Sequence, residues 1–274
     1  MKHIEVTLSS TQLDSHGDVM TREALESAAE KFKTHSIQMG YEHDPRHAPL
    51  GRLVDAWIED LPSGVSVLKA RGELFEPDDV LPEEIGKPIV EKHHPGGPLR
   101  LAVDMSYQGC EFEDDITSLS EVLGSKPQLE VKKAVEPLSV LVVSGAFVLG
   151  AIASGFFGSI GSDAYALLKS KLKGMLAKQR RRTTDQLMVF EFTISHHGHR
   201  VVVHTIGENP DDATVDGMLE NVVYELDKVH QDLFSVDHHL GRLVYMYRQG
   251  ELCFLYGVRE DGYPVTDRIV DREP

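Results

Sequence analysis

Apolar and polar residues alternate with a period of two in the first third of the chain, as in strands that bury one face. Between the last two of these runs, Leu61-Pro62-Ser63-Gly64 has the composition of a tight hairpin turn. The pattern therefore predicts antiparallel β-structure with few helices. The strand-like runs are residues 3–10, 37–41, 53–58 and 65–74.

One helix is predicted within this region, and Thr21 is suited to be its N-cap. Apolar residues recur at helical spacing from Leu25 to Phe32, so this helix would bury one face. An acidic stretch rich in Pro and Gly follows at residues 77–98 and is expected to form a surface loop. Residues 99–105 return to a strand pattern.

The last third of the chain has the order strand, strand, helix, strand, strand. Residues 186–194 and 200–206 predict one hairpin, and residues 243–247 and 252–258 predict another that turns at Gln249-Gly250. A helix that begins near residue 211 separates the two hairpins. The order predicts a small α+β domain in which a helix packs on an antiparallel sheet.

The middle of the chain carries no charged residue from position 138 to position 162. Small residues recur there at every fourth position, which favours close packing between helices. Basic residues follow after position 168. A helix of this kind either drives self-association or binds an anionic membrane surface. The small residues are Ala146, Gly150, Ser154, Gly158 and Ser162, and the basic ones are Lys169, Lys171, Lys173, Lys178 and residues 180–182.

Length and charge narrow the classes of protein that fit. A chain of 274 residues is long enough for about two domains. The formal net charge of −16 disfavours a nucleic-acid-binding protein, which needs a clustered positive surface. Two widely separated cysteines, Cys110 and Cys253, do not form a disulfide framework and fit a reducing compartment. We therefore expect a cytoplasmic protein, with contact to the inner membrane as the alternative for the central helix.

The segment around His43 is the first candidate for chemistry. Pro45 and Pro49 restrict the backbone there, so the His43 ring would be held in place. A held imidazole is suited to proton transfer near neutral pH. The alternative is that His43 and Asp44 only stabilise a turn.

Several short motifs lie around this segment: Ser9-Ser10-Thr11, Asp14-Ser15-His16-Gly17-Asp18, His43-Asp44, Pro49-Leu50-Gly51-Arg52, Glu73-Leu74-Phe75 and Asp104-Met105-Ser106-Tyr107. In their order these motifs resemble the prohead-protease family of tailed phages. The resemblance covers roughly residues 1–143, and it implies a mostly antiparallel, barrel-like serine protease domain related in fold to herpesvirus assemblins.

The resemblance implies that His43 is the base and Ser106 the nucleophile of a serine protease. Glu136 is the better candidate for the residue that orients the imidazole, and Glu130 is the other. The chain departs from the family pattern after Ser106, where Gln108-Gly109 replaces the expected pair of a glycine and an aromatic residue. A glycine at that point commonly lets a backbone amide approach the oxyanion, so Gly109 would have to serve one residue later or the oxyanion hole would be absent.

These observations predict an α+β chain with three parts: a prohead-protease-like domain at residues 1–143, a helical segment at 144–182 and an α+β binding or assembly domain at 183–274. The predicted function is a serine endopeptidase that acts on a protein substrate or on itself, within a bacterial or prophage-encoded multidomain protein for defence or regulated self-cleavage. The alternative is an inactive protease-fold scaffold or sensor. We expect a homo-oligomer through residues 145–178 and no nucleic-acid partner.

No cofactor or metal site is predicted. Histidines cluster in two predicted loops, but neither cluster has the ligand spacing of a zinc site. These residues are His196, His197, His199, His238 and His239.

Overall fold

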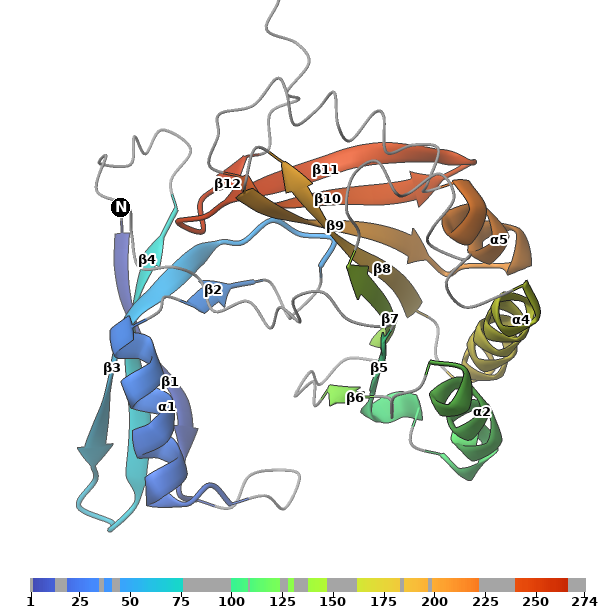
Figure 1. The fold of residues 1–274 in the computed structure, drawn as a ribbon. Coiled ribbons are helices and arrows are strands. Elements are labelled where there is room, and N and C mark those ends of the chain that lie inside the picture. Colours follow the sequence, from blue (N-terminus) through green and yellow to red (C-terminus); the bar gives the residue numbers. More distant parts are fainter. Residues whose placement is uncertain are drawn as a thin grey trace, which may run out of the picture. The chain divides into compact units, whose positions relative to one another are not determined.

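The computed structural model shows an α+β fold (Figure 1). It describes residues 2–12, 19–34, 37–40, 45–75, 100–107, 109–123, 128–130, 138–146, 162–182, 185–196, 199–221 and 240–265. Contacts divide the chain into two compact units, residues 1–92 with 258–265 and residues 93–257 with 266–274. The sequence predicted boundaries after residues 143 and 182 instead.

The first unit contains a four-stranded antiparallel sheet with one helix packed on it. Helix α1 (Arg22–Thr34) begins as predicted, because the Thr21 hydroxyl oxygen accepts a hydrogen bond from the Ala24 amide at 3.2 Å. Leu25 and Phe32 of α1 are buried against apolar residues of the sheet. The strands lie in the order β1 (Lys2–Ser10), β4 (Ser66–Leu74), β3 (Gly51–Asp60) and β2 (Ile37–Met39).

The described strands of this unit form an open sheet, so the predicted barrel-like domain is not supported. Two strands that the prediction assigned to the N-terminal domain, β5 (Arg100–Asp104) and β7 (Leu138–Ala146), pair in the other sheet. The reason lies in β7, whose residues from Ser139 to Val143 are almost all buried. A strand that is apolar on both faces requires a central place in a sheet covered on both sides.

The other sheet has eight strands in the order β12-β11-β10-β9-β8-β7-β5-β6. Strands β7 and β8 run parallel, as do β9 and β10, whereas β8 and β9 form the predicted antiparallel hairpin. The strands not yet defined are β6 (Gln128–Glu130), β8 (Asp185–His196), β9 (His199–Glu208), β10 (Leu240–Arg248), β11 (Glu251–Arg259) and β12 (Pro264–Val265).

The predicted order of two hairpins around a helix is confirmed for β8, β9, α5 (Asp212–Asn221), β10 and β11. The β10–β11 turn has positive φ at Gln249 and Gly250, as a two-residue hairpin turn requires. These elements do not form a separate sheet, because β8 pairs along its length with β7.

Helix α4 (Ser162–Gln179) lies on the connection from β7 to β8 and contacts α2 (Glu113–Leu123) and α5. Gly145 and Ala146, predicted to begin the central helix, are instead the last residues of β7 and pair with Phe192 and Thr193. Residues 147–161 lie outside the described part of the chain. Among the described residues, no helix has both the length and the apolar character needed to cross a bilayer.

Candidate functional site

Ser106 lies in the second unit, immediately after β5. The chain turns there through a short 3₁₀ helix, η1 (Met105–Tyr107), which is followed by a second, η2 (Cys110–Phe112), and then by α2. The Ser106 side chain is partly buried, while the neighbouring Asp104 is only 4% exposed. The candidate nucleophile therefore lies beside a buried carboxylate.

The Asp104 carboxylate fixes this turn by accepting three hydrogen bonds. Its Oδ1 accepts from the Ser106 amide at 2.8 Å and from the Ser106 hydroxyl at 2.5 Å. Its Oδ2 accepts from the Val140 amide of β7. The carboxylate thus holds the turn against the neighbouring strand.

Two more side chains extend the hydrogen bonding from Ser106 into the core. The hydroxyl oxygens of Ser106 and Ser139 are in contact, and the Gln179 side-chain amide donates to the Ser139 oxygen at 2.7 Å. Each hydroxyl can donate one hydrogen bond, and the Ser106 hydroxyl donates its hydrogen bond to Asp104. Ser139 must therefore donate to Ser106, so the chain of donors runs from Gln179 through Ser139 and Ser106 to Asp104.

Tyr107 packs next to this series of hydrogen bonds and is completely buried. Burial, followed by the nearby Asp104 charge, raises the pKa of the Tyr107 hydroxyl well above its usual range, and the adjacent Ser139 offsets part of this increase. The phenol stays protonated over the physiological pH range. It can therefore donate a hydrogen bond but cannot act as a base.

Gly109, the candidate oxyanion residue, is packed against an acidic side chain. A Cβ at this position would come within 2.5 Å of the Glu111 carboxyl carbon, so this carboxylate lies directly over Gly109. Arg182 holds Glu111 there through an ion pair at 2.6 Å. A carboxylate beside Gly109 opposes the build-up of a second negative charge at the same place.

Of His43, Ser106 and Glu136, the described part of the chain contains Ser106 only. His43 and Glu136 lie outside it, and their catalytic roles stay predictions. The other candidate, Glu130, ends the short strand β6.

Sequence reasoning missed the partners of Ser106, although each left a signal. Asp104 stands two residues before Ser106, the spacing at which a carboxylate caps a tight turn. Ser139 interrupts an apolar strand, and Gln179 continues the helical spacing of the buried residues Leu172 and Met175. A polar residue at a position whose period predicts burial needs a hydrogen-bonding partner.

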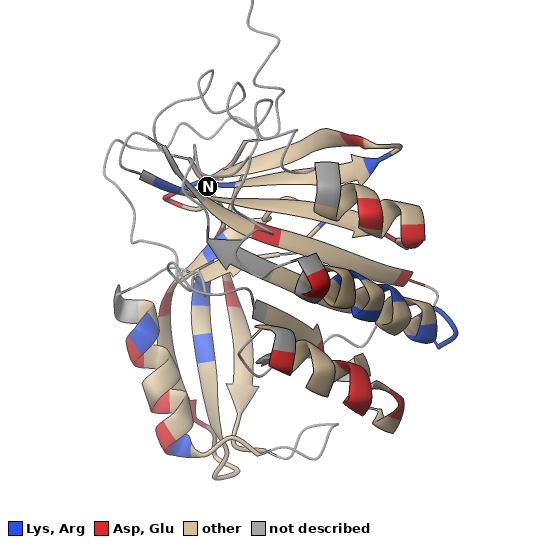
Figure 2. Cartoon of the chain, turned by 45° about the vertical axis from the view of Figure 1, so that its right-hand side comes forward, with Lys and Arg blue, Asp and Glu red and all other residues tan. Residues whose placement is uncertain are grey.

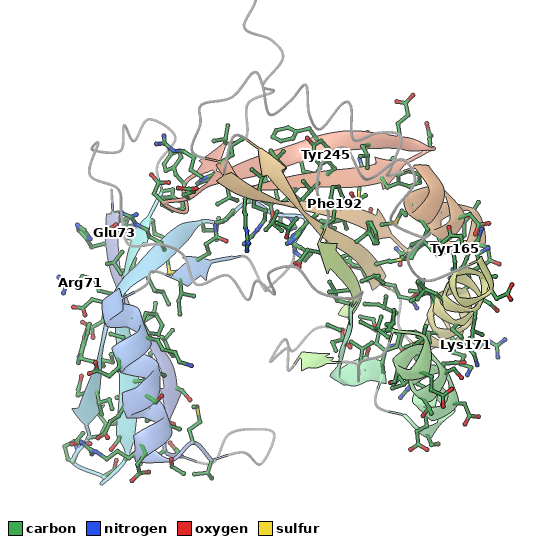
Figure 3. All side chains as sticks on the ribbon, in the orientation of Figure 1. Arg71, Glu73, Tyr165, Lys171, Phe192 and Tyr245 are labelled. Carbon is green, nitrogen blue, oxygen red and sulfur yellow. The ribbon has the colours of Figure 1, made fainter. Side chains whose placement is uncertain are left out.

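Two motifs of the resemblance meet in the first unit, where β3 and β4 pair. Gly51 stands opposite Leu74 and Arg52 opposite Glu73, and the Arg52 guanidinium donates to the Glu73 carboxylate at 3.0 Å. The Phe75 amide donates to the Leu50 carbonyl at 2.9 Å. Glu73 is labelled on β4 in Figure 3. Gly51, Arg52 and Glu73 thus have structural roles in the pairing of β3 and β4.

The lysines of α4 form ion pairs with acidic residues of the helices beside it. Asp115 of α2 pairs with Lys171 at 3.1 Å and with Lys178 at 2.7 Å, and Asp216 of α5 pairs with Lys169 and Lys173. Figure 2 shows the basic residues along α4 and the acidic ones on α2 and α5. The four lysines predicted to face a membrane or solvent therefore help to hold three helices together.

Apolar residues of α4 are also packed within the chain. Four of them are at most 1% exposed, namely Leu168, Leu172, Met175 and Leu176, whereas Leu167 is 41% exposed. The described half of the segment predicted for oligomerisation is thus packed within the second unit. Oligomer formation through residues 145–178 stays a prediction.

Replacing Asp115 by asparagine is expected to lower the free energy of unfolding by about 1.5 kcal/mol at pH 7, since the two lysines lose the carboxylate charge and one of its two accepting oxygens. Burial raises the pKa of Asp115, but hydrogen bonds from Lys178 and Lys171 outweigh it, so this pKa lies below its ordinary value. A carboxylate with a lowered folded-state pKa stabilises the fold above its unfolded pKa and loses that effect as the pH falls through the folded value.

Urea unfolding followed by circular dichroism at pH 7 and at successively lower pH values tests this prediction. The difference in the free energy of unfolding between wild type and Asp115→Asn should become smaller as the pH falls below about 4, where the carboxyl of the unfolded state titrates. Asp114→Asn, an exposed neighbour on the same helix, is the control. If this difference in the free energy of unfolding does not change with pH, the carboxylate charge does not have the proposed role.

A second pair of ionisable side chains lies on β8 and β9. Glu191 and His204 stand opposite each other, and His204 Nε2 lies 3.0 Å from the Glu191 carboxylate. The described residues contain no group of three or more His, Cys, Asp or Glu side chains that could hold a metal ion.

No family model, curated protein or solved structure matches the chain.

Proposed function

We propose that the chain is a non-catalytic binding or assembly protein, in which Ser106 stabilises the fold and the N-terminal region resembling prohead proteases serves as a scaffold. One observation carries this proposal. The Ser106 hydroxyl donates its only proton to the Asp104 carboxylate and also contacts Ser139. It therefore belongs to a structural hydrogen-bond network.

A serine nucleophile needs a base that takes its proton when the substrate is attacked. Asp104 already accepts hydrogen bonds from the Ser106 amide and from Val140, which fix the turn to β7. Moving Asp104 toward a catalytic role would break these contacts. The Glu111 carboxylate over Gly109 is a second argument, since it disfavours an oxyanion at that amide.

The second candidate function is a serine endopeptidase that acts on a protein substrate or on itself. The position of Ser106 favours it, since this residue is only partly buried and follows a strand, as the nucleophile does in the resembling family. In this proposal His43 would serve as the base and Glu136 would orient it, without a cofactor. The protein would act in the cytoplasm, either as a soluble oligomer or with its central segment at the inner membrane.

Labelling with a fluorophosphonate serine probe separates the two proposals. We expect no labelling of Ser106 in the intact chain, under conditions in which a reference serine hydrolase is labelled completely. Ser106→Ala should also leave any self-cleavage unchanged, while it lowers the free energy of unfolding by about 1 kcal/mol through the lost hydrogen bonds. Stoichiometric labelling that disappears in Ser106→Ala would establish the endopeptidase instead.

A further inference from the structure

Four buried polar side chains meet around Ser139 in the second unit, and we name them the Ser139 cluster: Ser139, Gln179, Gln186 and Tyr107. Each is at most 1% exposed. Gln179 donates to Ser139, and Tyr107 lies beside it. Gln186 stands opposite Ser139 in the parallel pairing of β7 and β8, so both side chains leave the same face of the sheet.

Most of the hydrogen-bonding capacity of this cluster is unused. Gln179 Oε1, both amide atoms of Gln186 and the Tyr107 hydroxyl are buried and have no hydrogen-bond partner among the described residues. The Gln186 amide donates to Asn209 Oδ1, and the Gln186 carbonyl accepts from the Asn209 amide, so the backbone of Gln186 is held in place. Buried polar groups in folded proteins nearly always have a partner, which is often an ordered water molecule.

The unused groups define what could occupy the cluster. Gln179 Oε1 and Gln186 Oε1 need donors, whereas the Gln186 amide protons and the Tyr107 hydroxyl need acceptors. The nearby Asp104 carboxylate already accepts three hydrogen bonds, and no member of the cluster is charged. An anion would therefore lack a partner of opposite charge, and a cation would find the nearby carboxylate already occupied by three donors.

We propose that the Ser139 cluster is an internal binding site for ordered water, which donates to the two glutamine oxygens and accepts from the Gln186 amide and the Tyr107 hydroxyl. Water is uncharged and offers two donors and two acceptors, which matches both kinds of unused group. The site would join η1, α4 and β8 through one hydrated network. It goes beyond the proposed function and does not depend on it.

A high-resolution crystal structure of the intact chain tests this proposal directly. We expect density for water at hydrogen-bonding distance, about 2.7 to 3.2 Å, from the Gln186 amide and Gln179 Oε1. If the two glutamines instead rotate to bond to each other and no density lies between them, the proposal is wrong.

The sign of a change in thermal stability gives a second test. If water fills the site, Gln186→Leu should lower the melting temperature, because it removes partners of the water and leaves Gln179 and Tyr107 unsatisfied. If the cluster is dry, the same substitution removes an unpaired buried amide and should leave the melting temperature unchanged or raise it.

Thr205→Val is the matched control for a single buried hydroxyl outside the cluster. The Thr205 hydroxyl is also buried and has no partner in the described part of the chain, and Thr205 pairs with Phe190, four residues along β8 from Gln186. Its substitution should leave the melting temperature unchanged or raise it. A melting temperature of Gln186→Leu equal to or above that of wild type would overturn the proposal, as would a dry cluster in the crystal.

Discussion

Replacing Asp104 by alanine is expected to lower the free energy of unfolding by about 4 kcal/mol, because three donors lose their buried acceptor. These donors are the amide and hydroxyl of Ser106 and the amide of Val140. Asp104→Asn keeps the shape but offers only one carbonyl oxygen, so its effect should be about half as large. Urea unfolding followed by far-ultraviolet circular dichroism measures both.

A double-mutant cycle shows whether Asp104 and Ser106 act as one unit. Ser106→Ala alone should lower the free energy of unfolding by about 1 kcal/mol. The double variant should lower it by less than the sum of the two single variants. A catalytic serine behaves differently, since replacing an active-site residue commonly leaves stability unchanged or increases it. Additive effects, or an Asp104→Ala variant as stable as wild type, would contradict the structural role of Ser106.

Local patterns in the sequence predicted local structure well. The Thr21 cap, the buried face of α1 and the Gln249-Gly250 turn are all confirmed, because each depends on residues close together in the chain. Helix α2 was missed, although Glu113, Asp114 and Asp115 form an acidic first turn that is typical of a helix start.

The pairing of distant strands could not be predicted from such patterns. The apolar run of β7 indicated a buried strand but not that β8, across a long connection, would be its parallel partner. Periodicity predicts which side chains share a face of a strand, whereas the strand with which it pairs depends on packing over the whole sheet. The predicted barrel failed for this reason, since β5 and β7 were assigned to the wrong sheet.

The same limit applies to the candidate site. The resemblance identified Ser106, but its contacts come from Asp104 at the end of β5, Ser139 of β7 and Gln179 of α4. Their roles follow from two long-range contacts, β5 with β7 and α4 with the sheet. A motif match therefore located the serine without revealing what its hydroxyl does.

Gly51 gives the second large expected effect, and it tests whether a motif residue is required for packing. A Cβ at Gly51 would overlap the Glu73 carbonyl oxygen and lie 3.0 Å from the Leu74 Cα. Both obstacles are backbone atoms of the paired strand β4, so rotation of a side chain cannot relieve the clash. Strands β3 and β4 would have to separate where Arg52 and Glu73 form their ion pair.

Gly51→Ala is therefore expected to lower the free energy of unfolding of the first unit by about 3 kcal/mol, the upper range for overpacking. The only tryptophan of the chain, Trp57, lies on β3, so its fluorescence reports the unfolding of this unit. Gly40→Ala is the matched control, because a Cβ there meets nothing within 4 Å. If both variants unfold at the wild-type urea concentration, packing does not explain the motif glycine, and a role in catalysis would become the better explanation.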